Sequence, residues 1–206
     1  VLIFESHADY TDNSRAFFEY LIDNQYNEKY KIYWFVNDAK KFHDKEQKNV
    51  KFITMWKNSV NRSFIQWIKY VWICKNARYL ISSNRTLHKI NKKTVTINLN
   101  HGTPLKNVKN LKVVPKDIDV LLAASDYCIT MLSDQLHLKE EQIICVGNPR
   151  NDIIFKKTNI EEKLNEFNSF KKVILWLPTF RKAATSDRLD SSFDFPLGLP
   201  IIYNIK

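Results

Sequence analysis

Residues 1–36 read VLIFESHADYTDNSRAFFEYLIDNQYNEKYKIYWFV, and this stretch decides the fold. The apolar run at residues 1–6 predicts a strand, residues 13–24 place apolar side chains at helical spacing behind a polar cap, and residues 30–36 predict a second buried strand. A helix that connects two short strands in this way returns the chain in the same direction, so the strands pair in parallel. The chain is therefore expected to open with a β-α-β unit.

The alternation of strands and helices continues along the chain. Strands are predicted at residues 50–54, 79–83, 94–100, 119–124 and 142–147, and helices at residues 59–76 and 126–137. Helices of this length cover both faces of a parallel sheet, which predicts a complete, doubly wound Rossmann-like α/β domain over residues 1–168. A polar helix at residues 160–168 and a fresh strand at residues 172–177 predict the truncated start of a second domain, residues 169–206.

The composition narrows the class of protein. Of the 206 residues, 44% are hydrophobic, which excludes a disordered chain and supplies the core of a full α/β domain. The net charge of +10 favours a polyanionic partner such as nucleic acid, anionic lipid or a phosphate-rich substrate. With only Gly102, Gly147 and Gly198, the chain cannot contain the glycine-rich dinucleotide turn, the P-loop or the GxSxG nucleophile elbow.

The cysteines and the apolar segments bear on the cellular location. Cys74, Cys128 and Cys145 are far apart among apolar neighbours, and we expect them to be buried core residues in a reducing compartment. No segment reaches the roughly 18 apolar residues that a membrane helix needs. Since the chain begins with neither a basic leader nor a methionine, we expect it to be cut from a longer parent.

The most informative chemical block is HGTPLK at residues 101–106, directly after a predicted strand. Gly102 permits a tight turn, Thr103 can cap a helix and Pro104 fits its first position, so His101 lies at a strand end beside a helix N-terminus. Free N–H groups there suit a phosphate, and an imidazole can accept a proton from a hydroxyl. A purely structural turn histidine is the alternative, but the surrounding glycine, cap and proline favour a functional one.

Two weaker blocks also follow predicted strands. GNPRND at residues 147–152 offers Arg150 as a phosphate clamp, although Asn151 and Asp152 could equally be caps with Arg150 as their ion-pair partner. PTFR at residues 178–181 places Thr179 and Arg181 after the strand that opens the expected second domain. Both blocks suit an anionic ligand without requiring one.

Two further features have plainer explanations. Lys106, Lys109 and Lys112 could together bind the phosphates of a polyanionic ligand, but a solvated helix face accounts for them better. In the predicted helix at residues 59–76, several large apolar residues could touch a membrane, whereas burial against the sheet is the simpler expectation; these are Trp67, Tyr70, Val71 and Trp72.

Together these blocks resemble the CDP-glycerol glycerophosphotransferase family, the enzymes that prime and polymerise teichoic acids and related capsule polymers. HGTPLK and the PRND motif at residues 149–152 are the specific matches. The supporting matches are residues 4–6, 12–15, 19–21, 81–84, 125–127 and 178–181. The resemblance implies a GT-B architecture, in which an acceptor-side domain faces a nucleotide-binding domain.

The resemblance also implies the reaction: an acceptor hydroxyl attacks the β-phosphorus of CDP-glycerol or CDP-ribitol, and CMP leaves. By this analogy His101 is the general base. Substrate and phosphate contacts are implied for Arg181, Arg150, Thr179, Thr103, Lys106, Asn13 and Arg15. No metal-ligand cluster is apparent in the sequence, and we expect no metal and no cofactor. The implied partners are a lipid-linked polyol-phosphate acceptor and the anionic inner face of the cell membrane, with no nucleic acid.

The sequence departs from the family pattern in two places. Asn100 stands where the family usually has an aromatic residue, which we expect to alter packing or acceptor fit rather than the chemistry. The chain also ends before the nucleotide-binding motifs, so we expect it to be inactive alone. Two alternatives stay open: a GT-B glycosyltransferase that uses a nucleotide sugar, and a non-enzymatic basic module that binds an anionic polymer or membrane.

Overall fold

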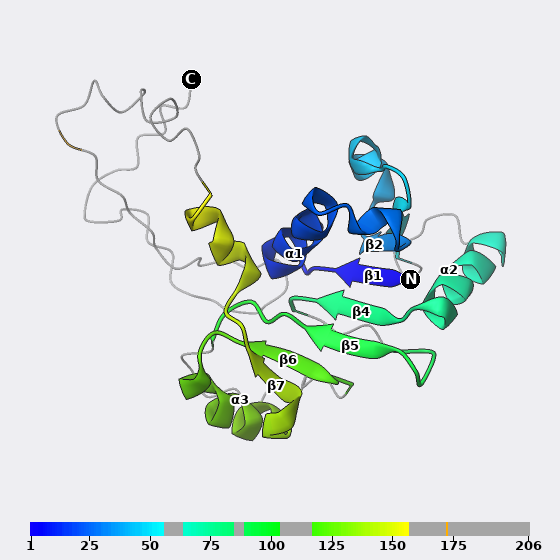
Figure 1. Cartoon of the computed structure of the whole chain (residues 1–206). Helices are drawn as coiled ribbons and strands as arrows, with labels where there is room; N and C mark the ends of the chain where they lie inside the picture. Colours follow the sequence, from blue (N-terminus) through cyan, green and yellow to red (C-terminus); the bar gives the residue numbers. More distant parts are fainter. Residues whose placement is uncertain (56–63, 85–88, 104–116, 157–171, 173–206) are drawn as a thin grey trace, which may run out of the picture. The chain divides into compact units, whose positions relative to one another are not determined.

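The computed structural model describes residues 1–55, 64–84, 89–103, 117–156 and 172 (Figure 1). All of these except Lys172 belong to a compact unit of residues Val1–Lys157, and Thr158–Lys206 form a second unit. The expected domain boundary after residue 168 and the helix expected at residues 160–168 lie outside the described residues. Of the strand expected at residues 172–177, only Lys172 is described.

A seven-stranded parallel sheet forms the centre of the described part, in the order β3-β2-β1-β4-β5-β6-β7. Its strands are β1 (Leu2–Glu5), β2 (Ile32–Val36), β3 (Val50–Thr54), β4 (Tyr79–Ser82), β5 (Val95–Asn98), β6 (Val120–Ala123) and β7 (Ile143–Cys145). From β1, strands β2 and β3 are added on one side of the sheet. The chain then returns to pair β4 with β1 and adds β5, β6 and β7 on the other side. This is the doubly wound α/β fold that the sequence predicts, and each strand expected between residues 1 and 147 is present within two residues of its predicted bounds.

The helices agree less closely with the sequence pattern. The α-helices are α1 (Asp12–Asp23), α2 (Phe64–Asn76) and α3 (Ile129–Leu136). Among the described residues, five short 3-10 helices accompany them: η1 (Tyr26–Glu28), η2 (Ala39–Lys45), η4 (Asp126–Cys128), η5 (Glu140–Gln142) and η6 (Pro149–Ile154). The single helix expected at residues 126–137 is thus η4 followed by α3. One or two turns are too short to produce a hydrophobic period, so the pattern could not show η2 or η6.

Alternate residues of β1 pack into two separate cores, one on each face of the sheet. Phe4 lies in an aromatic cluster beneath α1, where its ring centroid is 5.7 Å from Phe18 and 5.5 Å from the fully buried Trp34. Ile3 points to the opposite face and packs in a cluster with Phe35 and with residues of α2. The period of two along a strand therefore separates the layers, as expected for a sheet covered on both sides.

Two burial expectations are wrong. In α2, Tyr70 and Val71 are half-buried but Trp67 and Trp72 are 43% and 50% exposed. Large apolar residues surround this helix on most sides, and the single stripe that faces the sheet cannot bury them all. Cys145 is exposed on the edge strand β7, whereas Cys74 and Cys128 are buried as expected. Within the described ranges, no helix has the length and hydropathy to cross a membrane.

Candidate functional site

Polar residues gather where the central strands β1, β4 and β5 end. Ser6 follows β1, Ser83 follows β4, and Asn100 and His101 follow β5. These strands are neighbours in the sheet, and the order in which strands are added to the sheet reverses between β1 and β4. Ligands of open parallel sheets bind outside the carboxyl ends of the strands at such a switch point. This edge is therefore the first place to examine for chemistry.

The turn after β5 is shaped by two residues with positive φ. Asn100 has φ +59°, a left-handed conformation that asparagine tolerates better than most residues. Its N–H donates to Asn98 Oδ1 at 2.7 Å, and its own Oδ1 accepts from the His101 N–H at 2.8 Å. Gly102 has φ +136°, which a residue with a Cβ rarely adopts. These local bonds and angles give a physical reason for asparagine at position 100.

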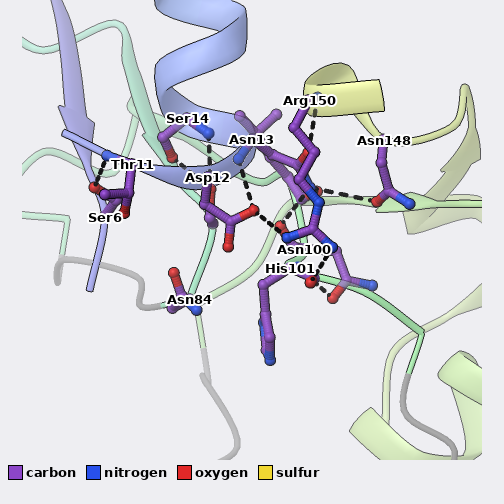
Figure 2. A network of polar contacts seen from close by, with 12 residues as sticks. Ser6, Thr11, Asp12, Asn13, Ser14, Asn84, Asn100, His101, Asn148 and Arg150 are labelled. Atoms are coloured by element: carbon purple, nitrogen blue, oxygen red, sulfur yellow. Dashed lines mark hydrogen bonds and ion pairs between the residues drawn. The ribbon is translucent and has the colours of Figure 1, made fainter. Parts of the chain in front are cut away.

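His101 presents its ring to solvent. The residue is exposed, and Figure 2 shows the imidazole pointing away from the surrounding polar network. Its backbone, by contrast, is held on both sides: Asn100 Oδ1 accepts from its N–H, and Arg150 Nη2 donates to its carbonyl at 2.9 Å. An accessible ring on a fixed backbone is suited to exchanging a proton with a bound alcohol.

Arg150 lies beside His101 and is paired with an aspartate from the start of the chain. Its Nη1 is 2.7 Å from Asp12 Oδ1, and its side chain remains 45% exposed. Asp12 has φ +61°, and its Oδ1 also accepts from the Asn13 N–H. The partner considered from the sequence, Asn151 or Asp152, is therefore wrong. No local pattern could indicate Asp12, because it is 138 residues away along the chain.

Asn13 occupies the middle of this network (Figure 2). It is fully buried in the first turn of α1, and its Nδ2 donates to the carbonyls of Leu99 and Asn100 at 3.1 and 2.8 Å. Nδ2 is also 3.3 Å from Asn148 Oδ1, and the Asn13 Oδ1 accepts from the Arg150 N–H at 3.1 Å. Both residues lie in the sequence motifs, but the motifs suggest neither that Asn148 contacts Asn13 nor that Asn13 binds the protein itself.

The other expected contacts are not part of this network. Arg15 forms an ion pair with Glu19 at 2.7 Å and stacks over the Tyr10 ring at 5.1 Å. Thr103, which is half-buried, has its Oγ1 3.7 Å from Cys128 Sγ. Lys106, Thr179 and Arg181 lie outside the described residues. The structure thus brings His101, Arg150 and Asn13 together and places Arg15 elsewhere on α1.

The chemistry available here is that of a base beside a cation. The exposed imidazole can accept a proton, and the neighbouring guanidinium can bind an anion through the edge that Asp12 and the His101 carbonyl leave free. In the part of the chain that the structure describes, no group of three or more His, Cys, Asp or Glu side chains is placed to hold a metal ion.

The chain is similar to known proteins over most of its length. Residues 1–197 match the family model described as CDP-Glycerol:Poly(glycerophosphate) glycerophosphotransferase. The teichoic acid poly(glycerol phosphate) polymerase of Bacillus spizizenii is 28% identical over 99% of this chain and 56% of its own length. The polymerase of the same name from Staphylococcus epidermidis is 28% identical over 98% of this chain and 30% of its own length. The chain therefore spans about half of the first relative, and less of the second.

Solved structures show the same fold. The wall teichoic acid polymerase TagF superposes with a TM-score of 0.60 and 23% sequence identity, over 81% of this chain and 42% of that one. At this identity the likeness concerns the fold, and it agrees with the parallel sheet described above.

Proposed function

This chain belongs to the CDP-glycerol:poly(glycerophosphate) glycerophosphotransferase family, and from that premise we propose that it is the acceptor-side part of a polyol-phosphate transferase. The donor is CDP-glycerol or CDP-ribitol, and the acceptor is a hydroxyl of a lipid-linked teichoic acid or capsule polymer. One observation carries the proposal: the exposed imidazole of His101, with its backbone fixed, at the carboxyl end of a central strand beside Arg150.

The proposed step is a displacement at phosphorus. His101 removes the proton from the acceptor hydroxyl while the oxygen attacks the β-phosphorus of the donor. The bond from this phosphorus to the bridging oxygen breaks, and CMP leaves with that oxygen. The products are a phosphodiester, CMP and a protonated imidazole. Arg150, whose Nη2 donates to the His101 carbonyl, is the cation that stabilises the negative charge on the phosphoryl oxygens.

The remaining expected contacts complete the proposal. Thr179 and Arg181 belong to a nucleotide-binding domain that begins after residue 168, and they bind the donor phosphates. Thr103 and Lys106 extend the phosphate contacts next to His101, and Arg15 meets the acceptor on the exposed part of α1.

The proposal is tested by replacing His101 with alanine in the full-length gene product. CMP release from CDP-glycerol or CDP-ribitol, in the presence of a teichoic-type acceptor, should fall by about 100- to 10,000-fold, the usual contribution of a general base. His43 on η2 is also exposed, so His43→Ala is the matched control and should leave the rate unchanged. Near-normal turnover by His101→Ala would remove His101 from the mechanism, and UDP release from UDP-sugars would favour the glycosyltransferase alternative.

We also propose that the protein contacts the anionic inner face of the membrane. The net charge of +10 and the exposed aromatic residues of α2 support this, since an apolar surface beside basic residues is typical of interfacial helices. Within α2, Phe64 is 72% exposed and Trp67 and Trp72 are about half exposed, with Lys69 between the two tryptophans.

A vesicle assay tests this contact. Trp67→Ser with Trp72→Ser should weaken cosedimentation with phosphatidylglycerol vesicles, while Tyr127→Ser, an exposed aromatic outside α2, should not. Equal binding by both variants would rule out α2 as the contact. Salt-sensitive binding to RNA in preference to vesicles would instead favour the non-enzymatic basic module.

A further inference from the structure

Asn13 is a polar side chain in an unusual place. It is 0% exposed, and a buried amide destabilises a fold unless its hydrogen bonds are made. Its two amide hydrogens meet three acceptors, the carbonyls of Leu99 and Asn100 and the Oδ1 of Asn148. Its oxygen accepts from the Arg150 N–H. In this conformation every polar atom of the Asn13 side chain is engaged by protein, which leaves none for a substrate.

These contacts form a closed network of hydrogen bonds around the backbone of His101. Asn13 holds the two carbonyls directly before His101 and also the N–H of Arg150. Arg150 then reaches back through Nη2 to the carbonyl of His101 at 2.9 Å. The turn after β5 is thereby tied to the start of α1 and to η6, which are distant in sequence. Because His101 is exposed, the direction of its imidazole depends largely on the backbone that carries it, and these contacts hold that backbone.

We propose that Asn13 is a positioning residue: it fixes the turn at residues 99–101 and so sets the direction of the His101 ring. This inference rests on the proposed role of His101 as general base. Catalysis is sensitive to such placement, since a shift of about 1 Å in a reacting group can lower the rate by about 100-fold. Asn13 acts through His101 and touches no substrate.

Asn13→Asp is the direct test, because it preserves the shape but replaces the donor that the Leu99 and Asn100 carbonyls require. The matched control is Asn27→Asp: Asn27 is also buried, and its Nδ2 donates to the Lys48 carbonyl at 3.1 Å, outside the network around His101. In the full-length gene product, Asn13→Asp should lower kcat by about 100-fold while KM for the CDP-activated donor stays within about two-fold. Asn27→Asp should leave both constants within about two-fold.

Nuclear magnetic resonance supplies a readout that a general loss of stability would not give. In the full-length gene product, the ring resonance of His101 is the one missing from His101→Ala. In Asn13→Asp this resonance should shift or split, while the ring resonances of the other histidines stay in place. Asn27→Asp should leave all the histidine resonances unchanged at the same temperature.

The outcomes separate this inference from the proposed function. If His101→Ala loses activity but Asn13→Asp keeps its kcat or leaves the His101 resonance unmoved, the positioning role is wrong and the general base stands. If His101→Ala remains active, the proposed function fails first. Should Asn13→Asp not fold, Asn148→Ala removes a single acceptor of the same amide and should shift the His101 resonance and lower kcat several-fold. An unmoved resonance in that variant would overturn the inference equally.

Discussion

Gly102 and Gly147 both have positive φ, but they should respond differently to substitution. Gly147 has φ +79° and open space where a Cβ would be, so Gly147→Ala is expected to cost about 1–2 kcal/mol from backbone strain alone. Gly102 has φ +136°, and an added Cβ would lie 3.6 Å from Arg150 Nη2, an ordinary contact. Crowding is therefore absent there as well, and the expected cost of Gly102→Ala, about 1–3 kcal/mol, also comes from the backbone.

Substitution by asparagine distinguishes the backbone conformation of Gly147 from that of Gly102. It tolerates the left-handed region near φ +60°, so Gly147→Asn should recover most of the stability that Gly147→Ala loses. The φ of Gly102 lies well outside that region, so Gly102→Asn should be as destabilising as Gly102→Ala. Urea unfolding of the four variants, read by tryptophan fluorescence, measures the free energies. If asparagine rescues position 102 as well as position 147, the argument from backbone angles is refuted.

Three further predictions use other parts of the unit. Trp34→Ala should lower the free energy of unfolding by about 3–5 kcal/mol in urea, since this fully buried ring contacts the aromatic core beneath α1; a loss under 1 kcal/mol would contradict its central place. Burial raises the pKa of Asp119, but hydrogen bonds from Thr96 and Lys89 outweigh it and hold the pKa below the usual 3.8. The stability that the ionised Asp119 contributes is thus present above about pH 4 and is lost as pH falls through the pKa of the folded state. Asp119→Asn should therefore make the free energy of unfolding less dependent on pH in the acid range. An unchanged dependence would contradict the role of these hydrogen bonds. An aromatic disulfide reagent should label Cys145 in the native protein well before Cys74 or Cys128, and equal labelling rates would contradict their burial.

The positions of the strands along the chain could be predicted from the sequence because each is a short apolar run bounded by polar residues. Residues 50–54 match β3 at both ends, and the bounds of the other strands move by at most two residues. The short helices η2 and η6 could not be predicted, since so few residues carry no period. The predicted burial of the α2 side chains was wrong for a related reason: a helix that is apolar on most sides does not show which of its faces packs against the sheet.

The candidate site was only partly visible in the sequence. Local signals around His101, a strand end followed by glycine and a cap, were sufficient to single it out. The sequence did not indicate the partners of His101, because hydrogen bonds between side chains and distant backbone follow from tertiary structure. Asp12, the first residue of α1, contacts Arg150, and Asn148, directly before η6, contacts Asn13; the two lie far apart in the sequence. A family motif can mark such residues together without saying which of them contact one another.

The link between Asn13 and Arg150 has a consequence for synthesis on the ribosome. These residues are 137 positions apart, so the buried amide of α1 has no partner for its oxygen until η6 has emerged. A nascent chain could pair its first strands early, yet the turn that carries His101 would settle only after β7 and η6 had joined. Ordering of this loop should therefore be among the last events of folding, so the backbone of His101 would be held in place only once η6 has been synthesised.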